Sequence, residues 1–294
     1  RVECGSFAQD SARLAYPVRM QTLPPPDADA LAHSAHLREV IQEQMIAAGG
    51  SLPFWKFMEL ALYAPGLGYY SAGATKFGDA GDFVTAPEIS PLFAACVADA
   101  LTPVLQQLGP DAQFMEIGGG SGAFAETCLS KLLANDALPA RYAILEPSAD
   151  LRERQRERLQ ERLPPLLFEL VEWLDGPIQE SWNGVLFANE VIDALPTPRF
   201  TIRDGEVFEE HVALDGEGRF LRSDRPADPM LASAVRHVER QLPQPFAEGY
   251  RSELLAQLPY WLQAVIGGMG DGARLFVDSG HARGEYYRPQ RRDG

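Results

Sequence analysis

Short apolar runs alternate with segments of helical periodicity along most of the 294-residue chain. Runs of this kind suit buried strands, and strands that alternate with helices usually form a parallel, doubly wound sheet. The segments Ala123–Leu133 and Leu151–Leu163 are helix-compatible, and the second carries the alternating charges of a solvated face. The pattern predicts an α/β fold with a Rossmann-like sheet. The expected strands lie at Phe114–Met115, Arg141–Leu145, Leu166–Val171, Val185–Ala188 and Arg274–Val277.

The part of the chain before these strands has a different pattern of apolar and polar residues. Helical spacing predicts helices over Leu31–Ala48, Ser51–Tyr63 and Ser90–Leu108. Between the second and third of these, Gly66–Ile89 is rich in glycine and aromatic residues. Loops of that length are usually functional or disordered, and the aromatic content argues against disorder. We therefore expect a long structured loop there.

A long insertion, Val191–Gly272, separates the fourth and fifth expected strands. It contains a hairpin signal at Asp204-Gly205 and helical stretches near Ala232–Leu242 and Ser252–Val265. We interpret this insertion as a substrate-binding cap over the sheet. The expected organisation is 1–30 as a leader and extended lead-in, 31–110 as a helical and loop cover, 111–190 with 273–294 as the cofactor-binding core, and 191–272 as the cap.

Acidic residues outnumber basic ones, with 41 Asp and Glu against 26 Lys and Arg and a net charge of −15. This charge argues against nucleic acid or an anionic membrane surface as a partner. No apolar run of about 18 residues occurs, so we predict no membrane span. The three widely spaced cysteines are typical of reduced thiols in a cytosol-like compartment. The five histidines include one close pair only, so we predict no metal site.

The segment after the first expected strand carries the most specific chemical signal. Glu116 is followed by Gly118, Gly120 and Gly122, with glycine at every second position. A strand that ends in such a turn lets backbone amides and the next helix N-terminus approach a ligand closely. The turn therefore indicates a site for a nucleotide-type cofactor.

Two cofactors fit this turn. The G-x-G-x-x-A dinucleotide pattern is satisfied by Gly118, Gly120 and Ala123, so a nicotinamide cofactor is one alternative. Glu116 and Gly122 instead complete E-x-G-x-G-x-G, which favours S-adenosylmethionine (SAM), because an acidic residue can serve the methionine amino group and no pyrophosphate needs neutralising. Glu146 ends the second strand, where a carboxylate can accept hydrogen bonds from both ribose hydroxyls. A purely structural glycine turn is the remaining alternative.

Polar residues also end the later strands, and ligands of open α/β sheets bind outside the carboxyl ends of the strands. Glu172 and Trp173 follow the third expected strand, where an adenine ring would lie, although a buried Trp can simply pack. Asn189 and Glu190 follow the fourth, with Asp193 nearby, and are candidates for substrate or cofactor binding. Their alternative interpretation is a helix N-cap at Asn189 with acidic residues at the positive end of the helix dipole.

The aromatic loop supplies a second group of candidates. Asp82 and Thr85 are placed to close over the methionine part of the cofactor. Tyr69 and Tyr70 are candidates for lining a channel for the methyl acceptor, and Glu88 for contacting it. The alternatives are packing roles for the tyrosines and a helix-capping role for Glu88.

Taken together, these motifs are similar to those of the MidA family, over a stretch from about Leu52 to the end of the chain. The GDF-x-T-x-PEIS loop and the NE-x-x-DALP segment are more specific than the glycine turn. The resemblance implies a class I SAM-dependent methyltransferase with a seven-stranded sheet. The motifs are Gly68-Tyr69-Tyr70, Lys76-Phe77-Gly78, Gly81–Ser90 (GDFVTAPEIS), Glu116–Gly122 (EIGGGSG), Ala188–Pro196 (ANEVIDALP) and Glu285–Arg291 (EYYRPQR).

The chain departs from the family pattern in two ways. The fifth expected strand ends in Val277-Asp278-Ser279-Gly280, where the family has an aromatic residue after the aspartate. Only five strands are accounted for, so we expect the sixth and seventh strands of the family sheet to be missing. Two alternatives follow: the sequence is a fragment of a longer chain, or the insertion or a partner chain covers the edge of the sheet.

Mitochondrial members of the family act in assembly of respiratory complex I by symmetric dimethylation of an arginine, so the resemblance implies a protein substrate with an arginine acceptor. Carboxylates must hold a guanidinium by paired hydrogen bonds, which makes Asn189, Glu190 and Asp193 the candidate catalytic residues. The expected location is the cytoplasm, or the mitochondrial matrix for a eukaryotic chain, and formation of a homo-oligomer stays open. A noncatalytic assembly factor that keeps the cofactor fold is the alternative.

Overall fold

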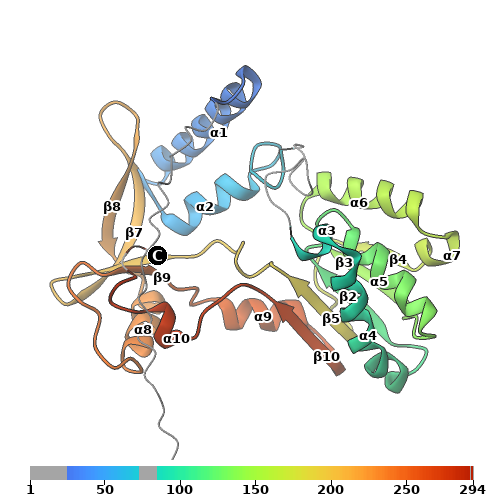
Figure 1. Ribbon diagram of the computed structural model, residues 1–294. Helices are drawn as coiled ribbons and strands as arrows, with labels where there is room; N and C mark the ends of the chain where they lie inside the picture. Colours follow the sequence, from blue (N-terminus) through green and yellow to red (C-terminus); the bar gives the residue numbers. More distant parts are fainter. Residues whose placement is uncertain (1–24, 73–84, 292, 294) are drawn as a thin grey trace, which may run out of the picture.

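The computed structural model describes residues 25–72, 85–291 and 293, and it contains two five-stranded sheets that lie side by side (Figure 1). The first sheet is parallel throughout. The α/β fold with a Rossmann-like sheet is therefore confirmed. In spatial order its strands are β10 (Met269–Val277), β5 (Trp182–Asn189), β2 (Gln113–Ile117), β3 (Arg141–Leu145) and β4 (Val171–Leu174).

The second sheet is antiparallel and combines the N-terminal part of the chain with the insertion. Its strands in spatial order are β1 (Ser51–Pro53), β7 (Glu206–Leu214), β6 (Arg199–Arg203) and β9 (Arg251–Glu253), with β8 (Phe220–Pro226) also paired to β7. The hairpin predicted at Asp204-Gly205 joins β6 and β7. Both of its turn residues are left-handed, with φ of 50° and 72°, as a two-residue hairpin turn requires.

Helices cover both sheets. Those near the parallel sheet are α3 (Ala86–Ile89), α4 (Pro91–Leu108), α5 (Ala123–Ala134), α6 (Ala149–Arg162), α7 (Pro165–Phe168) and α9 (Leu258–Ile266). Those near the second sheet are α1 (Ala28–Ala47), α2 (Phe54–Tyr63), α8 (Pro229–Glu239) and α10 (Arg283–Tyr286). In Figure 1, α2 and α9 extend from the second sheet toward the parallel one.

The parallel sheet is buried on both faces because successive side chains of a strand point to opposite sides. On one face, Phe187 of β5 stacks on Phe124 of α5 with ring centroids 4.1 Å apart. On the other, Leu186 packs in a cluster with Val265 of α9. Each fully buried side chain of this size contributes roughly 1.5–3 kcal/mol. These two clusters fix the sheet between its helices and so fix the positions of the strand ends.

The helix α4 is long and apolar enough to cross a membrane by length and composition alone. Its inward face, which includes Ala98, Leu101 and Leu105, is buried in the cluster that covers the parallel sheet. Packing against the sheet therefore accounts for the apolar residues on this inward face.

The prediction of a third strand at Leu166–Val171 is wrong. Pro165 begins the short helix α7, because a proline at the first helical position has its φ already set and lacks only an amide that would be unpaired there. The strand β4 therefore starts at Val171. Glu172 and Trp173, which are predicted to follow the end of this strand, therefore lie inside β4.

Two predicted helices begin later than expected. Ser51–Pro53 forms β1 and pairs with β7, so the helix that follows starts at Phe54. Arg251–Glu253 likewise forms β9 on β6, and α9 starts at Leu258. In both places the residues form a strand, because they pair with a strand distant in sequence, although their local apolar spacing is helical.

The number of strands in the parallel sheet is the number expected from the sequence. Within the described ranges this sheet has five strands and no sixth or seventh, and β10 lies at its edge beside β5. The loop predicted at Gly66–Ile89 ends in the helix α3, and residues 73–84 lie outside the described part of the chain.

The closest backbone approach in the core is at Gly184 of β5, where a Cβ atom would lie 1.8 Å from the carbonyl oxygen of Gln113. We expect Gly184→Ala to lower the free energy of unfolding by more than about 2 kcal/mol, since neither backbone can yield without breaking the ladder. Gly216→Ala is the matched control, because a Cβ there meets nothing within 4 Å. Denaturant unfolding of both variants tests this, and equal midpoints would contradict it.

Candidate active site

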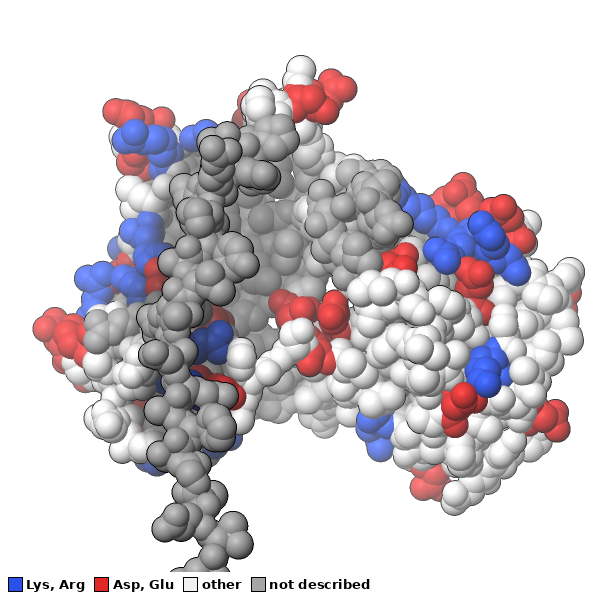
Figure 2. Space-filling model, in the orientation of Figure 1, with Lys and Arg blue, Asp and Glu red and all other residues white. Residues whose placement is uncertain are grey.

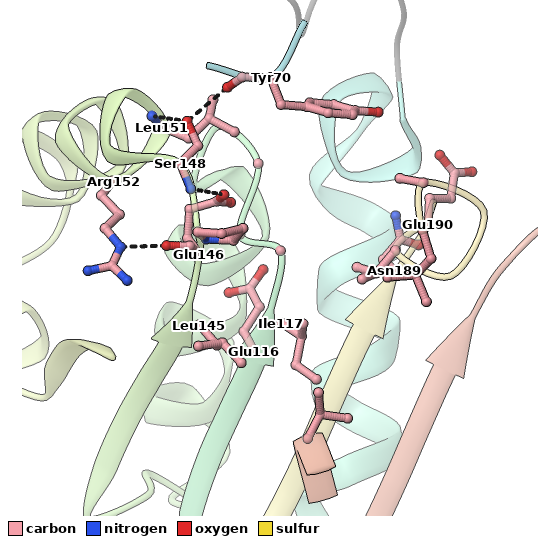
Figure 3. Close-up of a pocket in the computed structure, with 18 of the residues that line it drawn as sticks. Tyr70, Glu116, Ile117, Leu145, Glu146, Ser148, Leu151, Arg152, Asn189 and Glu190 are labelled. Atoms are coloured by element: carbon pink, nitrogen blue, oxygen red, sulfur yellow. Dashed lines mark hydrogen bonds between the residues drawn. The ribbon is translucent and has the colours of Figure 1, made fainter. Parts of the chain in front are cut away.

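A cavity of about 840 Å³ opens where β2, β3 and β5 end, and residues of α2 and α9 also line it (Figure 3). Figure 2 shows acidic side chains gathered in the hollow between the two parts of the molecule. The cavity brings together most of the side chains singled out in the sequence. Of the predicted site residues, its lining contains Tyr70, Thr85, Glu88, Glu116, Gly118, Gly120, Glu146, Asn189, Glu190 and Asp193.

The glycine turn has the backbone that its sequence predicts. Gly118, Gly120 and Gly122 have φ of 69°, 54° and 84°, a region that residues with a Cβ rarely adopt. At Gly118 a Cβ would lie 2.8 Å from Cγ2 of Val191, so the turn packs closely against the segment after β5. Gly122 is the N-cap of α5 and packs on Gln155 outside the cavity lining.

Glu116 lies inside β2 with only 2% of its surface exposed. The Tyr142 hydroxyl donates a 2.7 Å hydrogen bond to Oε2 of Glu116. Burial raises the pKa of Glu116 to about 7, against the opposing effect of the Tyr142 hydrogen bond, and the charge of Glu146 adds to the increase. This carboxylate therefore changes its charge readily near neutral pH.

Glu146 is equally buried at the end of β3 (Figure 3). The backbone amide of Ser148 donates a 3.0 Å hydrogen bond to its Oε1, and Gln155 Nε2 donates one of 3.3 Å to its Oε2. Burial raises the pKa of Glu146 to about 7, although both hydrogen bonds and the charge of Arg152 act in the opposite direction. Gln155 also donates a 2.9 Å bond to the Gly120 carbonyl and so links this carboxylate to the glycine turn.

Asn189 ends β5, and Glu190 and Asp193 lie on the turn that follows it. No helix begins here among the described residues, so the alternative of an N-cap with acidic residues on a helix dipole is wrong. Glu190 has a left-handed backbone, with φ of 50°. Burial raises the pKa of Glu190 and of Asp193, and neighbouring carboxylates raise both further. Both acidic side chains line the cavity, and the Asp193 carboxylate also accepts a hydrogen bond from the backbone amide of Ala194 within the turn.

Tyr70 lies across the cavity from this turn (Figure 3). Its ring stacks on Tyr63 with centroids 5.5 Å apart, and its carbonyl accepts a 2.8 Å hydrogen bond from the Ser148 hydroxyl. Burial raises the pKa of Tyr70, and the charges of Asp193 and Glu190 contribute next. Tyr69 packs edge-on against Tyr70 but does not itself line the cavity.

Glu88 contacts the glycine turn rather than capping the following helix. It accepts a short hydrogen bond from the Ser121 hydroxyl, whereas α4 is capped by Ser90. Thr85 precedes α3 and lines the cavity without a side-chain capping bond. Asp82 lies outside the described residues.

Glu172 and Trp173 do not line the cavity, because the strand that carries them is displaced. Glu172 pairs with Arg141 at 2.9 Å, and Trp173 donates a 2.9 Å hydrogen bond to Gln155 while Arg156 lies over its ring. Packing and hydrogen bonding therefore account for the Trp. At the end of β4 the cavity is lined instead by residues 175–177, which begin with Asp175.

Three further groups escaped the sequence analysis. Gln155 lies in the charged helix α6, which also contains Gln160, so its sequence neighbours did not distinguish it. Trp261 lines the cavity from α9, and Glu59 from α2. Their apolar or charged neighbours in sequence gave no sign of the cavity, since it forms only when the two parts of the molecule meet.

The lining fits SAM on two observations. Within the described ranges, neither Glu116 nor Glu146 forms an ion pair, so both buried carboxylates are available to a cationic or hydroxyl-bearing ligand. Gly118, Gly119 and Gly120 line the cavity with backbone atoms only, so a ligand can approach this part of the turn closely. Glu116 and the glycine turn would hold the methionine part, and Glu146 the ribose.

The parallel sheet, the glycine turn and the buried carboxylates at the strand ends are the features of the α/β class of SAM-dependent methyltransferases. A family model described as "Putative S-adenosyl-L-methionine-dependent methyltransferase" matches residues 96–294, and the chain belongs to that family. The similarity to the MidA family is thereby confirmed, and SAM rather than a nicotinamide is the cofactor.

Two solved structures are similar to this chain in both sequence and fold. A Burkholderia thailandensis protein bound to S-adenosyl-homocysteine has a TM-score of 0.83 and 38% identity, over 93% of this chain and 70% of that chain. A second crystal structure from the same organism has a TM-score of 0.79 and 36% identity. Because the first of these relatives holds the demethylated cofactor, a cofactor site belongs to this architecture.

Two curated relatives are named "Protein arginine methyltransferase NDUFAF7 homolog, mitochondrial". The Drosophila melanogaster protein is 27% identical and matches over 65% of this chain and 49% of its own length. The Caenorhabditis elegans protein is 24% identical, over 69% of this chain and 52% of its own. The chain thus spans about half the length of the curated relatives that it matches.

The raised pKa values of Glu116 and Glu146 predict that SAM binding releases protons. At about pH 6 both carboxyls are largely protonated, and the cationic ligand favours their ionised form, so binding must expel protons. Calorimetry in buffers of different ionisation enthalpy measures that release. We expect Glu116→Gln to release fewer protons than the wild type at about pH 6, with the difference vanishing by about pH 9.

Glu217→Gln, at the exposed tip of the β7–β8 hairpin, is the control and should release as many protons as the wild type. Equal release by Glu116→Gln and the wild type at the lower pH would contradict a raised pKa at Glu116.

Proposed function

We propose that this protein transfers a methyl group from SAM to an arginine side chain of a protein substrate. The observation that carries this proposal is the turn after β5, whose Glu190 and Asp193 line the same cavity as Tyr70; Figure 3 shows Glu190 and Tyr70. The names of the two curated relatives support the same acceptor. A protein partner, a cytoplasmic location and a link to respiratory complex assembly remain predictions.

A guanidinium suits these side chains. It is a planar cation with several N–H donors, and two carboxylates can accept paired hydrogen bonds from it. Asn189 adds an amide beside them at the end of β5. The aromatic ring of Tyr70 offers a face on which a guanidinium can stack. The acceptor would then lie between the strand ends and the tyrosines.

Methyl transfer needs alignment more than covalent catalysis. When bound, SAM supplies a methyl group activated on a sulfonium. The residues of this chain then hold the acceptor nitrogen in line and exclude water. As the new N–C bond forms, the methyl–sulfur bond breaks with its electron pair left on sulfur, and the attacking nitrogen gives up a proton. Glu190 and Asp193, whose pKa values are raised, are suited to accept that proton. The apolar wall formed by Trp261 and Val265 keeps water from the donor side.

The test is methyl transfer from radiolabelled SAM to lysate proteins of cells that lack this gene, followed by hydrolysis and separation of methylarginines. We expect Glu190→Gln and Asp193→Asn each to reduce labelled methylarginine about 10- to 100-fold, because each removes a charged partner of the guanidinium. Binding of S-adenosyl-homocysteine, measured by calorimetry, should be retained in both variants.

Glu217→Gln is again the matched control and should label like the wild type, whereas Gly120→Val should label nothing, because a branched side chain does not suit its left-handed backbone. A wild-type protein that binds S-adenosyl-homocysteine but labels no protein would identify a noncatalytic assembly factor. Label on a residue other than arginine would overturn the choice of acceptor.

A further inference from the structure

Asp278 is the first residue after β10 and lies next to the turn that carries the acceptor-binding carboxylates. Its Oδ2 accepts hydrogen bonds from the backbone amides of Val191 (3.3 Å) and Ile192 (3.0 Å). Its Oδ1 accepts one of 3.3 Å from the amide of Asp193. One carboxylate therefore binds three consecutive amides of a segment that is more than eighty residues away in sequence.

The turn needs such support because its backbone is unusual. Glu190 adopts a left-handed conformation, which is unfavourable for a residue with a Cβ. Its amide donates a 2.7 Å hydrogen bond to the Val277 carbonyl, so β10 holds the turn at its start as well. Consecutive amides that are not taken up by a helix need an acceptor, and Asp278 supplies it. A residue keeps an unfavourable backbone conformation only where several surrounding contacts hold it there, as Val277 and Asp278 do for this turn.

We propose that Asp278 is a positioning residue, which fixes the turn so that Glu190 and Asp193 face the acceptor. This inference rests on the proposed function. Asp278 does not line the cavity itself, so it acts through the two carboxylates rather than on the substrate. Charge-assisted hydrogen bonds are the stronger kind, which suits a residue that must hold a geometry closely.

The same carboxylate sets the electrostatic surroundings of the pair. Its charge raises the pKa of Glu190 and of Asp193, in addition to the effect of burial. The other titratable groups that interact with the pair are Tyr63, which faces Asp193, and Tyr70, which faces both carboxylates; Glu146 interacts with these tyrosines. A neutral residue at position 278 therefore removes one negative charge from this group and leaves the others in place.

The experiment compares Asp278→Asn and Asp278→Ala with the wild type in the radiolabelled lysate assay, across a range of pH. We expect Asp278→Ala to lower methylarginine formation about 10- to 100-fold, the loss that a displaced catalytic geometry produces. Both variants should move the acidic limb of the pH–rate profile to lower pH, because the pair ionises more easily without the neighbouring charge. A merely structural role would not move that limb.

Asp271→Asn is the matched control, an exposed aspartate earlier on β10, and it should keep both the rate and the pH profile. Affinity for S-adenosyl-homocysteine should change by less than about threefold in Asp278→Asn, which shows that the cofactor site is intact. Wild-type activity in Asp278→Ala, or an unmoved acidic limb in Asp278→Asn, would overturn the inference. If instead the wild type forms no methylarginine, the proposed function itself fails.

Discussion

Hydrogen-bond register in the parallel sheet is the constraint from which the site follows. Ile117 of β2 pairs with Leu145 of β3 and with Ala188 of β5, and Val277 of β10 pairs with Asn189. Each strand is therefore in step with its neighbour where it ends. The residues that come next, which include the glycine turn, Glu146, Glu190 and Asp278, meet at one edge although they come from four distant segments. A shift of one residue in any pairing would turn these side chains toward the opposite face.

Burial at this edge of the sheet raises the pKa values of the two carboxyls in the site. Carboxylates that are withdrawn from water bind protons more tightly, and at Glu116 and Glu146 burial outweighs the hydrogen bonds that oppose it. Each of these carboxyls therefore binds a proton more readily than an exposed one, which limits the cost of burying it. A ligand with positive charge restores their ionised form. The preference for a cationic cofactor is therefore a property of the cavity, beyond the shape of the glycine turn.

The sequence identified those parts of the site that depend on local structure. The glycine turn, Glu146 and the segment from Asn189 to Asp193 each follow a strand whose apolar run is unambiguous, so their positions could be predicted. Glu172 and Trp173 could not be placed correctly, because the proline at 165 starts a helical turn inside the expected strand. Gln155 and Asp278 act through contacts with segments far away in sequence, which no local pattern reports.

The second sheet raises the question of how the acceptor reaches the cavity. Its first strand comes from the N-terminal part of the chain and its others from the insertion, so neither segment forms it alone. From β1 the chain passes directly into α2, where the Tyr63 hydroxyl donates a 2.7 Å hydrogen bond to the Ala194 carbonyl. This bond joins α2 to the same turn that Asp278 holds from the other side. The turn that carries Glu190 and Asp193 is thus held from both sides, and a movement of one sheet relative to the other is expected to change the position of these carboxylates. Substrate choice in this protein is therefore expected to depend on the second sheet as much as on the residues that touch the acceptor.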